Sequence, residues 1–292
     1  MANLKDIKRR IGSVKNTQQI TKAMKLVAAA RLRRAQEAVA AARPYSDKIH
    51  EVMERLSAKA DTDSHPLLKR REVKNVLIVL CSGDKGLCGP FNSNVIKATQ
   101  QVIAANEGKN VSLVVVGKKG VDFYRRRSFP LLSRHLDYSK NLTIDYARQI
   151  VDVVVKKFVE EQADKVYLIY NKFRNVVVQV PQTVPLLPVQ PPVNRDEDLA
   201  STDADAVDYE YEPSAEAVLD GVITLYIENQ IFQALLESAA SENGARMTAM
   251  DSATRNAKEM IEALTLSFNK ARQAAITTEL SEVVSGADAL EG

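Results

Sequence analysis

Hydrophobic and polar residues recur at helical spacing over very long stretches at both ends of the chain. Residues 4–57 contain only Gly12 and Pro44 as helix-breaking residues, and residues 214–284 contain no proline. Helices of globular domains average about a dozen residues, so each stretch predicts one helix of unusual length. At 1.5 Å per residue the two helices would be roughly 80 Å and 105 Å long.

The hydrophobic seam of the first predicted helix changes position partway along its length. Its first part has alternating spacings of three and four residues, at Leu4, Ile7, Ile11 and Val14. The next apolar positions are Ile20, Met24 and Val27. Because these positions break the repeat, the sequence predicts a stutter that locally changes the supercoil.

The last predicted helix carries a similar pattern of small and apolar residues. Spacings of three and four residues separate Met250, Ala253, Ala257, Met260 and Leu264. Two such helices can cover their stripes against each other, and the intervening chain makes that pairing antiparallel. Their unequal lengths would leave a C-terminal overhang of roughly 25 Å. A hairpin for dimerisation and a smooth rod that sits inside a partner both fit this pattern.

The middle of the chain alternates between strand and helix signals. Strands are predicted at residues 73–81, 111–117, 166–173 and 176–187. Helices are predicted at residues 92–106 and 143–161, with a short helical turn at 118–127. This alternation predicts an α/β fold with a partly parallel sheet and helices on its faces. Pro181 and Pro185 confine the last strand to a sheet edge.

Four segments follow from these elements. We expect an N-terminal helix and linker at residues 1–72, an α/β domain at 73–190, an acidic loop at 191–213 and a C-terminal helix at 214–292. The aliphatic runs are strand-sized, so no membrane span is predicted. The first residues lack the apolar core of a signal peptide, and two cysteines suit a reducing compartment. A bacterial, cytosolic protein is therefore expected.

The net charge of +3 hides a strong asymmetry along the chain. Residues 1–36 carry ten Lys or Arg and one acid, whereas residues 196–220 carry ten acids and no base. Residues 221–292 carry ten acids and five bases, so the two helices have opposite net charge, which favours their pairing. The surplus positive charge favours an acidic protein partner over nucleic acid, because no groove-reading motif accompanies it.

The turn at residues 82–92 is the one segment that resembles a phosphate-binding loop. Gly83, Gly86 and Gly89 recur every three residues, and no GxxxxGK[ST] pattern occurs in the chain. Amides at a helix start can bind anions, but glycines at a tight strand-to-helix turn are commonly needed for the turn itself. We therefore expect a structural turn.

No other pattern predicts catalysis or ligand binding. Lys85 near Cys88 could favour a thiolate, but no histidine is close to it in sequence. His50, His65 and His135 are scattered without the spacing of metal ligands. The sequence predicts no catalytic residue, no cofactor-binding residue and no metal ligand.

Four separate segments resemble the gamma subunit of F-type ATP synthases. The run ARQAAITTELSEVVSGADAL at residues 271–290 is similar to that family's closing signature. Within it the matching positions are Ile276, Thr277, Glu279, Glu282, Gly286 and Ala287. The opening NTQQITKAMKLVAAARLRRAQ (16–36), the turn DKGLCGPFN (84–92) and the segment YEYEP (209–213) also match, in the family's order.

The resemblance implies a central rotor shaft. Its terminal helices would form an antiparallel coiled coil inside a ring of three alpha and three beta subunits, with an inserted Rossmann-like α/β domain. The shaft would couple proton- or sodium-driven rotation of a c-ring to ATP synthesis or hydrolysis at the beta subunits. It would be a non-catalytic subunit without cofactors, present once per complex and binding no nucleic acid. It would lie at the cytoplasmic face of the bacterial inner membrane, as a peripheral protein reaching the membrane only through the c-ring.

The resemblance also implies contact residues. A contact with a beta-subunit loop falls on Arg272 and Gln273. A coupling-sensitive position on the opposing helix falls on Met24, with Lys22 and Lys25 beside it.

At the other end of the shaft, the family's contact with the c-ring and the epsilon subunit falls on Tyr209, Tyr211 and Glu212. Chloroplast members carry a regulatory insertion with a cysteine pair. Residues 190–213 contain no cysteine, so thiol control is not expected.

Two other classes of function stay open at this point. One is a nucleotide-binding α/β enzyme with a coiled-coil dimerisation arm, and this alternative rests only on the turn at residues 82–92. The other is a basic coiled-coil protein that binds nucleic acid, which would show steeply salt-dependent binding.

Overall fold

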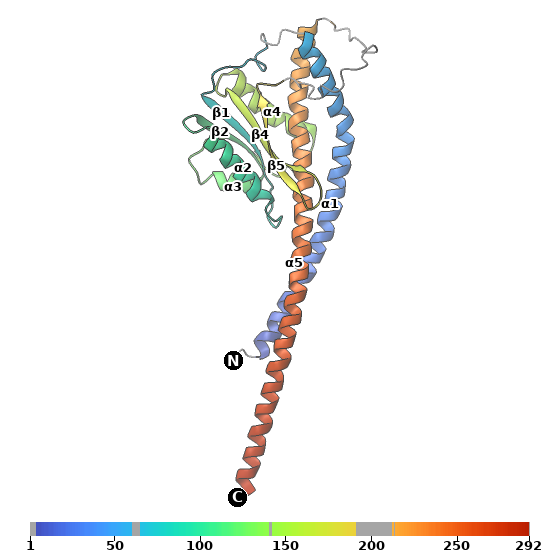
Figure 1. Cartoon of the computed structure of the whole chain (residues 1–292), viewed down its shortest axis with the longest axis vertical. Helices are drawn as coiled ribbons and strands as arrows, with labels where there is room; N and C mark the ends of the chain where they lie inside the picture. The colour runs from blue at the N-terminus through green and yellow to red at the C-terminus, as the bar shows by residue number, and fades with distance from the viewer. Residues whose placement is uncertain (1–3, 60–64, 140–141, 191–211, 213, 292) are drawn as a thin grey trace, which may run out of the picture. The chain divides into compact units, whose positions relative to one another are not determined.

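Two long helices dominate the computed structural model, which describes residues 4–59, 65–139, 142–190, 212 and 214–291 (Figure 1). Helix α1 spans Leu4–Lys59 and continues through Pro44, and helix α5 spans Ala215–Glu291. Both predicted terminal helices are confirmed.

The chain divides into two compact units, and each long helix contributes to both. The smaller unit consists of α1 up to Ala29 and α5 from Arg246 onward. The larger unit consists of residues Ala30–Ala245 and contains a five-stranded sheet.

The sheet combines parallel and antiparallel strands, as predicted. In chain order its strands are β1 (Asn75–Cys81), β2 (Asn110–Val116), β3 (Leu131–His135), β4 (Lys165–Phe173) and β5 (Gln179–Leu187). They are arranged in the order β3-β2-β1-β4-β5. Neighbouring strands are parallel except β5, which pairs antiparallel with β4 and forms one edge. The other edge is β3, a strand that the sequence did not predict.

One face of the sheet is covered by α2 (Phe91–Ala105) and α3 (Lys118–Tyr124). Alternate residues of β1, Val76, Ile78 and Leu80, point to this face and pack with Val95 of α2 and Tyr124 of α3. All of these side chains are fully buried. The alternation follows from the two-residue period of a strand.

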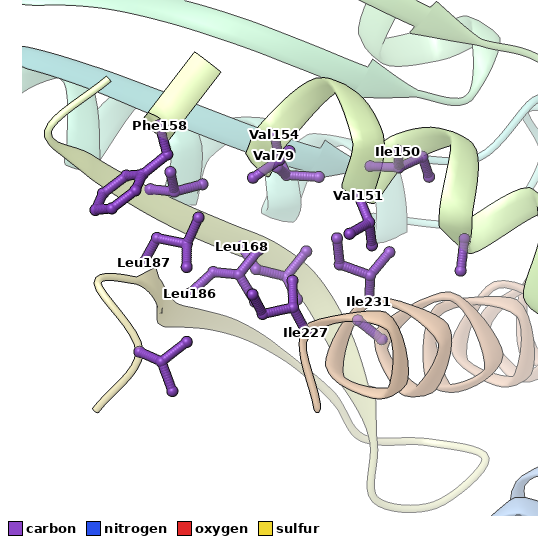
Figure 2. Packing of buried hydrophobic residues seen from close by; sticks show 14 of the residues in the cluster. Val79, Ile150, Val151, Val154, Phe158, Leu168, Leu186, Leu187, Ile227 and Ile231 are labelled. Carbon is purple, nitrogen blue, oxygen red and sulfur yellow. The ribbon is translucent and has the colours of Figure 1, made fainter. Parts of the chain in front are cut away.

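The opposite face carries α4 (Ile144–Val159) and the part of α5 that belongs to the larger unit. Figure 2 shows Val154 of α4 close to Val79 of β1, with Leu168 of β4 lying toward Ile227 of α5. The hydroxyl of Thr143 caps α4 by accepting the amide hydrogen of Tyr146. Helices on both faces fulfil the predicted α/β layering.

Candidate functional site

A pair of long helices makes up the smaller compact unit. On α1, buried or half-buried positions recur every three or four residues without a break, at residues 4, 7, 11, 14, 18, 21, 25 and 28. On α5 the corresponding positions are residues 250, 254, 257, 261, 264, 268, 271 and 275. This spacing is the heptad pattern of two helices that pack along a common seam.

The predicted stutter in α1 is wrong. Ile20 and Val27 are 60% and 52% exposed, whereas Thr21 and Ala28 are 8% and 1% exposed. The helix keeps its heptad repeat by turning polar Gln18 and Thr21 toward the seam, while the apolar residues that suggested a new seam face outward.

Two polar contacts cross between the helices where the stutter was expected. Lys25 Nζ lies 2.6 Å from Asp251 Oδ1, and Thr254 Oγ1 donates a hydrogen bond to Thr21 Oγ1 at 2.8 Å. The hydrogen bond from Lys25 is the largest influence on Asp251 and lowers the pKa of its carboxyl group. Because both charged side chains are more than a third exposed, the ion pair fixes geometry more than it adds stability.

The same contacts show that the helices run antiparallel. Going back from Lys25 to Thr21 on α1 corresponds to going forward from Asp251 to Thr254 on α5. In this register Leu4 lies opposite roughly residue 272. The side chains of residues 276–286 are all exposed, which is expected of a helix that has passed the described end of its partner.

The residues expected to contact a beta subunit form two separate groups on these helices. Arg272 and Gln273 are exposed on α5, close to the level at which α1 begins. Lys22 is exposed and Met24 is half-buried on α1, and Lys25 is the partner of Asp251. About twenty residues of helix separate the two levels, which corresponds to roughly 30 Å. The structure therefore places the two groups at different levels of the helix pair.

The residues expected at the c-ring end are only partly described. Glu212 is exposed, and Tyr209 and Tyr211 lie outside the described residues.

The glycine turn after β1 uses its polar groups internally. The Gly83 amide donates to Asn92 Oδ1 at 2.8 Å. Ser82 Oγ accepts the amide hydrogen of Gly120 and donates to the Val116 carbonyl. These contacts support the expected structural role of the turn.

Carboxylates surround the same turn. Asp84 Oδ1 accepts the amide hydrogens of Lys118 and Asp137, each at 3.1 Å. Glu242 of α5 is 4% exposed and lies against Gly83, and it accepts a hydrogen bond from Tyr138 Oη at 3.0 Å. Burial is the main cause of a strongly raised pKa of the Tyr138 hydroxyl, and Glu242 adds to it. Two carboxylates beside the turn would repel a phosphate group.

The cysteines and histidines form no common site among the described residues. Cys81 and Cys88 are buried and form no disulfide bond, and burial raises the pKa of the Cys81 thiol to about 12. His50 Nδ1 donates to the Ser46 carbonyl, and its other nitrogen lies 3.0 Å from Gln230 Nε2. Among the described residues there is no cluster of His, Cys, Asp and Glu that could hold a metal ion.

No helix in the described part of the chain is both long enough and apolar enough to cross a membrane.

Fold and site together define one class of protein: two long terminal helices, antiparallel where they pair, that flank an inserted α/β domain. The family model described as ATP synthase matches residues 3–290. Relatives named ATP synthase gamma chain include those of Pelotomaculum thermopropionicum, 49% identical over 292 residues, and Desulforamulus reducens, 48% identical over 292 residues. Each alignment covers 100% of both chains. This chain belongs to the ATP synthase gamma chain family, as the four sequence segments indicated.

Solved structures of ATP synthase rotors are similar in fold. A chain from the central stalk and c-ring of the Tetrahymena thermophila mitochondrial ATP synthase is 27% identical, with a TM-score of 0.60. That alignment covers 80% of this chain and 99% of the other. A rotor chain of the Euglena gracilis mitochondrial ATP synthase shares the fold, with a TM-score of 0.67 at 19% identity over 94% of this chain and 98% of the other.

Proposed function

We propose that this chain is the central rotor shaft of an F-type ATP synthase. It would be a non-catalytic subunit that couples rotation of a proton- or sodium-driven c-ring to ATP synthesis or hydrolysis at the beta subunits. The observation that carries this proposal, beyond family membership, is the antiparallel helix pair from which α5 continues alone. From residue 276 to Glu291, roughly 25 Å, α5 pairs with no other helix among the described residues, which suits insertion into another assembly.

The exposed side chains of α5 support this reading. Ile276, Leu280 and Val283 are 48%, 60% and 70% exposed on the segment beyond α1. Apolar residues gathered on an unpaired helix indicate a surface that another protein covers. The proposed cover is the ring of three alpha and three beta subunits, with one copy of this chain inside it as part of an antiparallel coiled coil.

We assign the beta-subunit contacts to two levels of the helix pair. Arg272 and Gln273 form one level, and Met24 with Lys22 forms the other. Lys25 lies at the second level beside Met24, and its ammonium group forms an ion pair with Asp251. An exposed arginine can form a bidentate contact with a carboxylate of a partner loop, which is a reason to expect arginine at such a position.

Replacing Arg272 in the purified complex tests this assignment. Arg272→Ala should leave assembly intact and lower ATP-driven turnover, because a rotating shaft makes the contact at only some angles. Arg272→Lys should recover part of the loss, since lysine lacks the planar fork. Lys270→Ala is the matched control, because Lys270 is also an exposed cation on the same part of α5. Wild-type turnover and proton pumping in the Arg272→Ala complex would remove this residue from the mechanism.

At the opposite end we propose that Tyr209, Tyr211 and Glu212 contact the c-ring and the epsilon subunit. The chain would then be peripheral on the cytoplasmic face of the bacterial inner membrane. Cysteines introduced at positions 209 and 211 should form crosslinks to the c-ring loop in intact membranes. Crosslinks to alpha or beta subunits alone would show that the shaft has the reverse orientation.

The isolated chain should hydrolyse no ATP. In the one turn that resembles a phosphate-binding loop, the Gly83 amide is bonded to Asn92, and the carboxylates of Asp84 and Glu242 lie in or beside the turn. Turnover that persists after removal of all alpha and beta subunits would favour the alternative of a nucleotide-binding enzyme.

A further inference from the structure

Helix α1 offers two possible seams between residues 20 and 28. One consists of Thr21, Lys25 and Ala28, which face α5 in the structure. The other consists of Ile20, Met24 and Val27. Each member of the second set precedes a member of the first by one residue, so the two seams differ by a rotation of about 100° around the helix axis. A stutter would give that rotation without moving the ends of the helix.

Apolar burial alone favours the seam that the structure does not use. Ile20 and Val27 are 60% and 52% exposed, whereas threonine and alanine occupy the equivalent buried positions. Removing isoleucine and valine side chains from water would be the more favourable choice if nothing else acted. Another interaction must therefore decide which face of α1 meets α5.

The contacts across the seam supply that interaction. The Lys25 ammonium lies 2.6 Å from Asp251, and the Thr21 and Thr254 hydroxyls are 2.8 Å apart. Turning α1 by about 100° would carry both α1 side chains away from α5 and break both contacts. The methyl group of Ala28, 1% exposed, also occupies less space between the helices than a valine at the same depth would.

We propose that Thr21, Lys25, Asp251 and Thr254 are positioning residues that select the seam between the two helices. They hold Thr21, Lys25 and Ala28 inward and keep Ile20 and Val27 on the outer face of the pair, while Met24 stays half-buried. Polar contacts in an otherwise apolar seam are a known means of specifying how helices pair. That the outer face then meets a partner subunit rests on the proposed function, but the selection of the seam does not.

Thiol labelling of the full-length chain tests the selection. Val27→Cys and Ala28→Cys are made separately as reporters, and their rates of reaction with a small maleimide are compared with that of the parent chain, in which Cys81 and Cys88 are buried. In the otherwise unchanged chain, the Val27→Cys thiol should react faster than the Ala28→Cys thiol by a factor on the order of ten or more. Replacing Asp251 by leucine and Thr254 by valine should reverse the order, because α1 then turns its apolar residues toward α5.

Adjacent reporters separate a change of seam from simple loosening. Loosening would speed up both reactions, whereas rotation slows the Val27→Cys reaction while speeding that of Ala28→Cys. In the double variant Lys25→Asp, Asp251→Lys, the ion pair can form with its charges exchanged. The Val27→Cys thiol should then again react faster than the Ala28→Cys thiol. Arg255→Leu removes the other cation near Asp251, 3.5 Å away on the same helix, and should leave the order unchanged. The proposal is overturned if the Val27→Cys thiol does not react more slowly in the Asp251→Leu, Thr254→Val chain than in the otherwise unchanged chain.

Discussion

Replacing Tyr138 by phenylalanine tests how α5 is held against the sheet in the larger compact unit. The Tyr138 side chain is fully buried, and its hydroxyl donates to Glu242 Oε2 at 3.0 Å. The substitution keeps the ring and removes one donor from a carboxylate that is 4% exposed. An acceptor at that depth cannot recover the lost bond from bulk water.

The expected loss of stability follows from the partners. A hydrogen bond to a charged group contributes about 1.5–3 kcal/mol. Phenylalanine has no hydroxyl to desolvate, which offsets part of this contribution, so the free energy of unfolding should fall by about 2 kcal/mol. Tyr146→Phe is the matched control, because its hydroxyl donates to the Leu136 carbonyl at 3.2 Å in an exposed position. There the loss should stay below about 1 kcal/mol.

Amide hydrogen exchange of β1 in the full-length chain measures this loss. The amides of Leu77–Leu80 report the opening of the larger unit directly, without mixing in the melting of the helix pair. Their opening free energy should fall by about 2 kcal/mol in Tyr138→Phe and by clearly less in Tyr146→Phe. Equal losses in the two variants would refute the view that the buried carboxylate contact fastens α5 to the sheet.

Three further predictions concern the core and the pH dependence of stability. Ile231→Ala removes a fully buried side chain of α5 and should cost about 2–5 kcal/mol in urea unfolding, against less than about 1 kcal/mol for Leu225→Ala, which is 40% exposed. Burial raises the pKa of the Cys81 thiol from 9.0 to about 12, so the folded chain retains a proton that the unfolded chain loses, and stability should fall by about 1.4 kcal/mol per pH unit in that window. Urea titrations of Cys81→Ala should show a shallower alkaline decline than the parent, and an identical decline would contradict this. The pKa of Asp251 is lowered, so its contribution is present above its ordinary value and lost as the pH falls through the lowered one. The protection factors of the amides of residues 251–257, measured against their intrinsic exchange rates, should therefore fall in acid. Asp251→Asn should lack this fall.

Most of the fold could be predicted because its elements carry strong periodic signals. The terminal helices repeat their pattern over dozens of residues, and β1 is a continuous apolar run bounded by polar turns. Strand β3 carries only a five-residue pattern of alternate half-buried and exposed residues, which include Arg134 and His135. Its place at the edge beside β2 is set by pairing with that strand, and no local signal in the sequence shows it.

The candidate site was predicted only through resemblance, and its internal contacts were missed. The stutter was inferred by counting apolar positions alone, which skips Gln18 and Thr21. Continuing the heptad repeat through polar residues would have predicted the observed seam of α1. The contact between Tyr138 and Glu242 had no such signal, because 104 residues separate the pair and only the packing of α5 on the sheet brings them together.

In the smaller unit, polar contacts lie within a mostly apolar seam while Ile20 and Val27 face outward, and this arrangement suits the proposed function. Hydrogen bonds and ion pairs are directional, so Thr21, Lys25, Asp251 and Thr254 hold the two helices in one orientation. Apolar contact is non-directional and roughly proportional to area. An outer face that includes Ile20 and Val27 can therefore touch successive neighbours without a specific bond to break at each step. Exposed charges such as Lys22 and Arg272 lie on the outer face as well, so directional contacts with a partner are confined to a few positions. Apolar contacts at Ile20 and Val27 can form with each neighbour in turn, whereas the contact proposed for Arg272 forms at only some angles of the shaft.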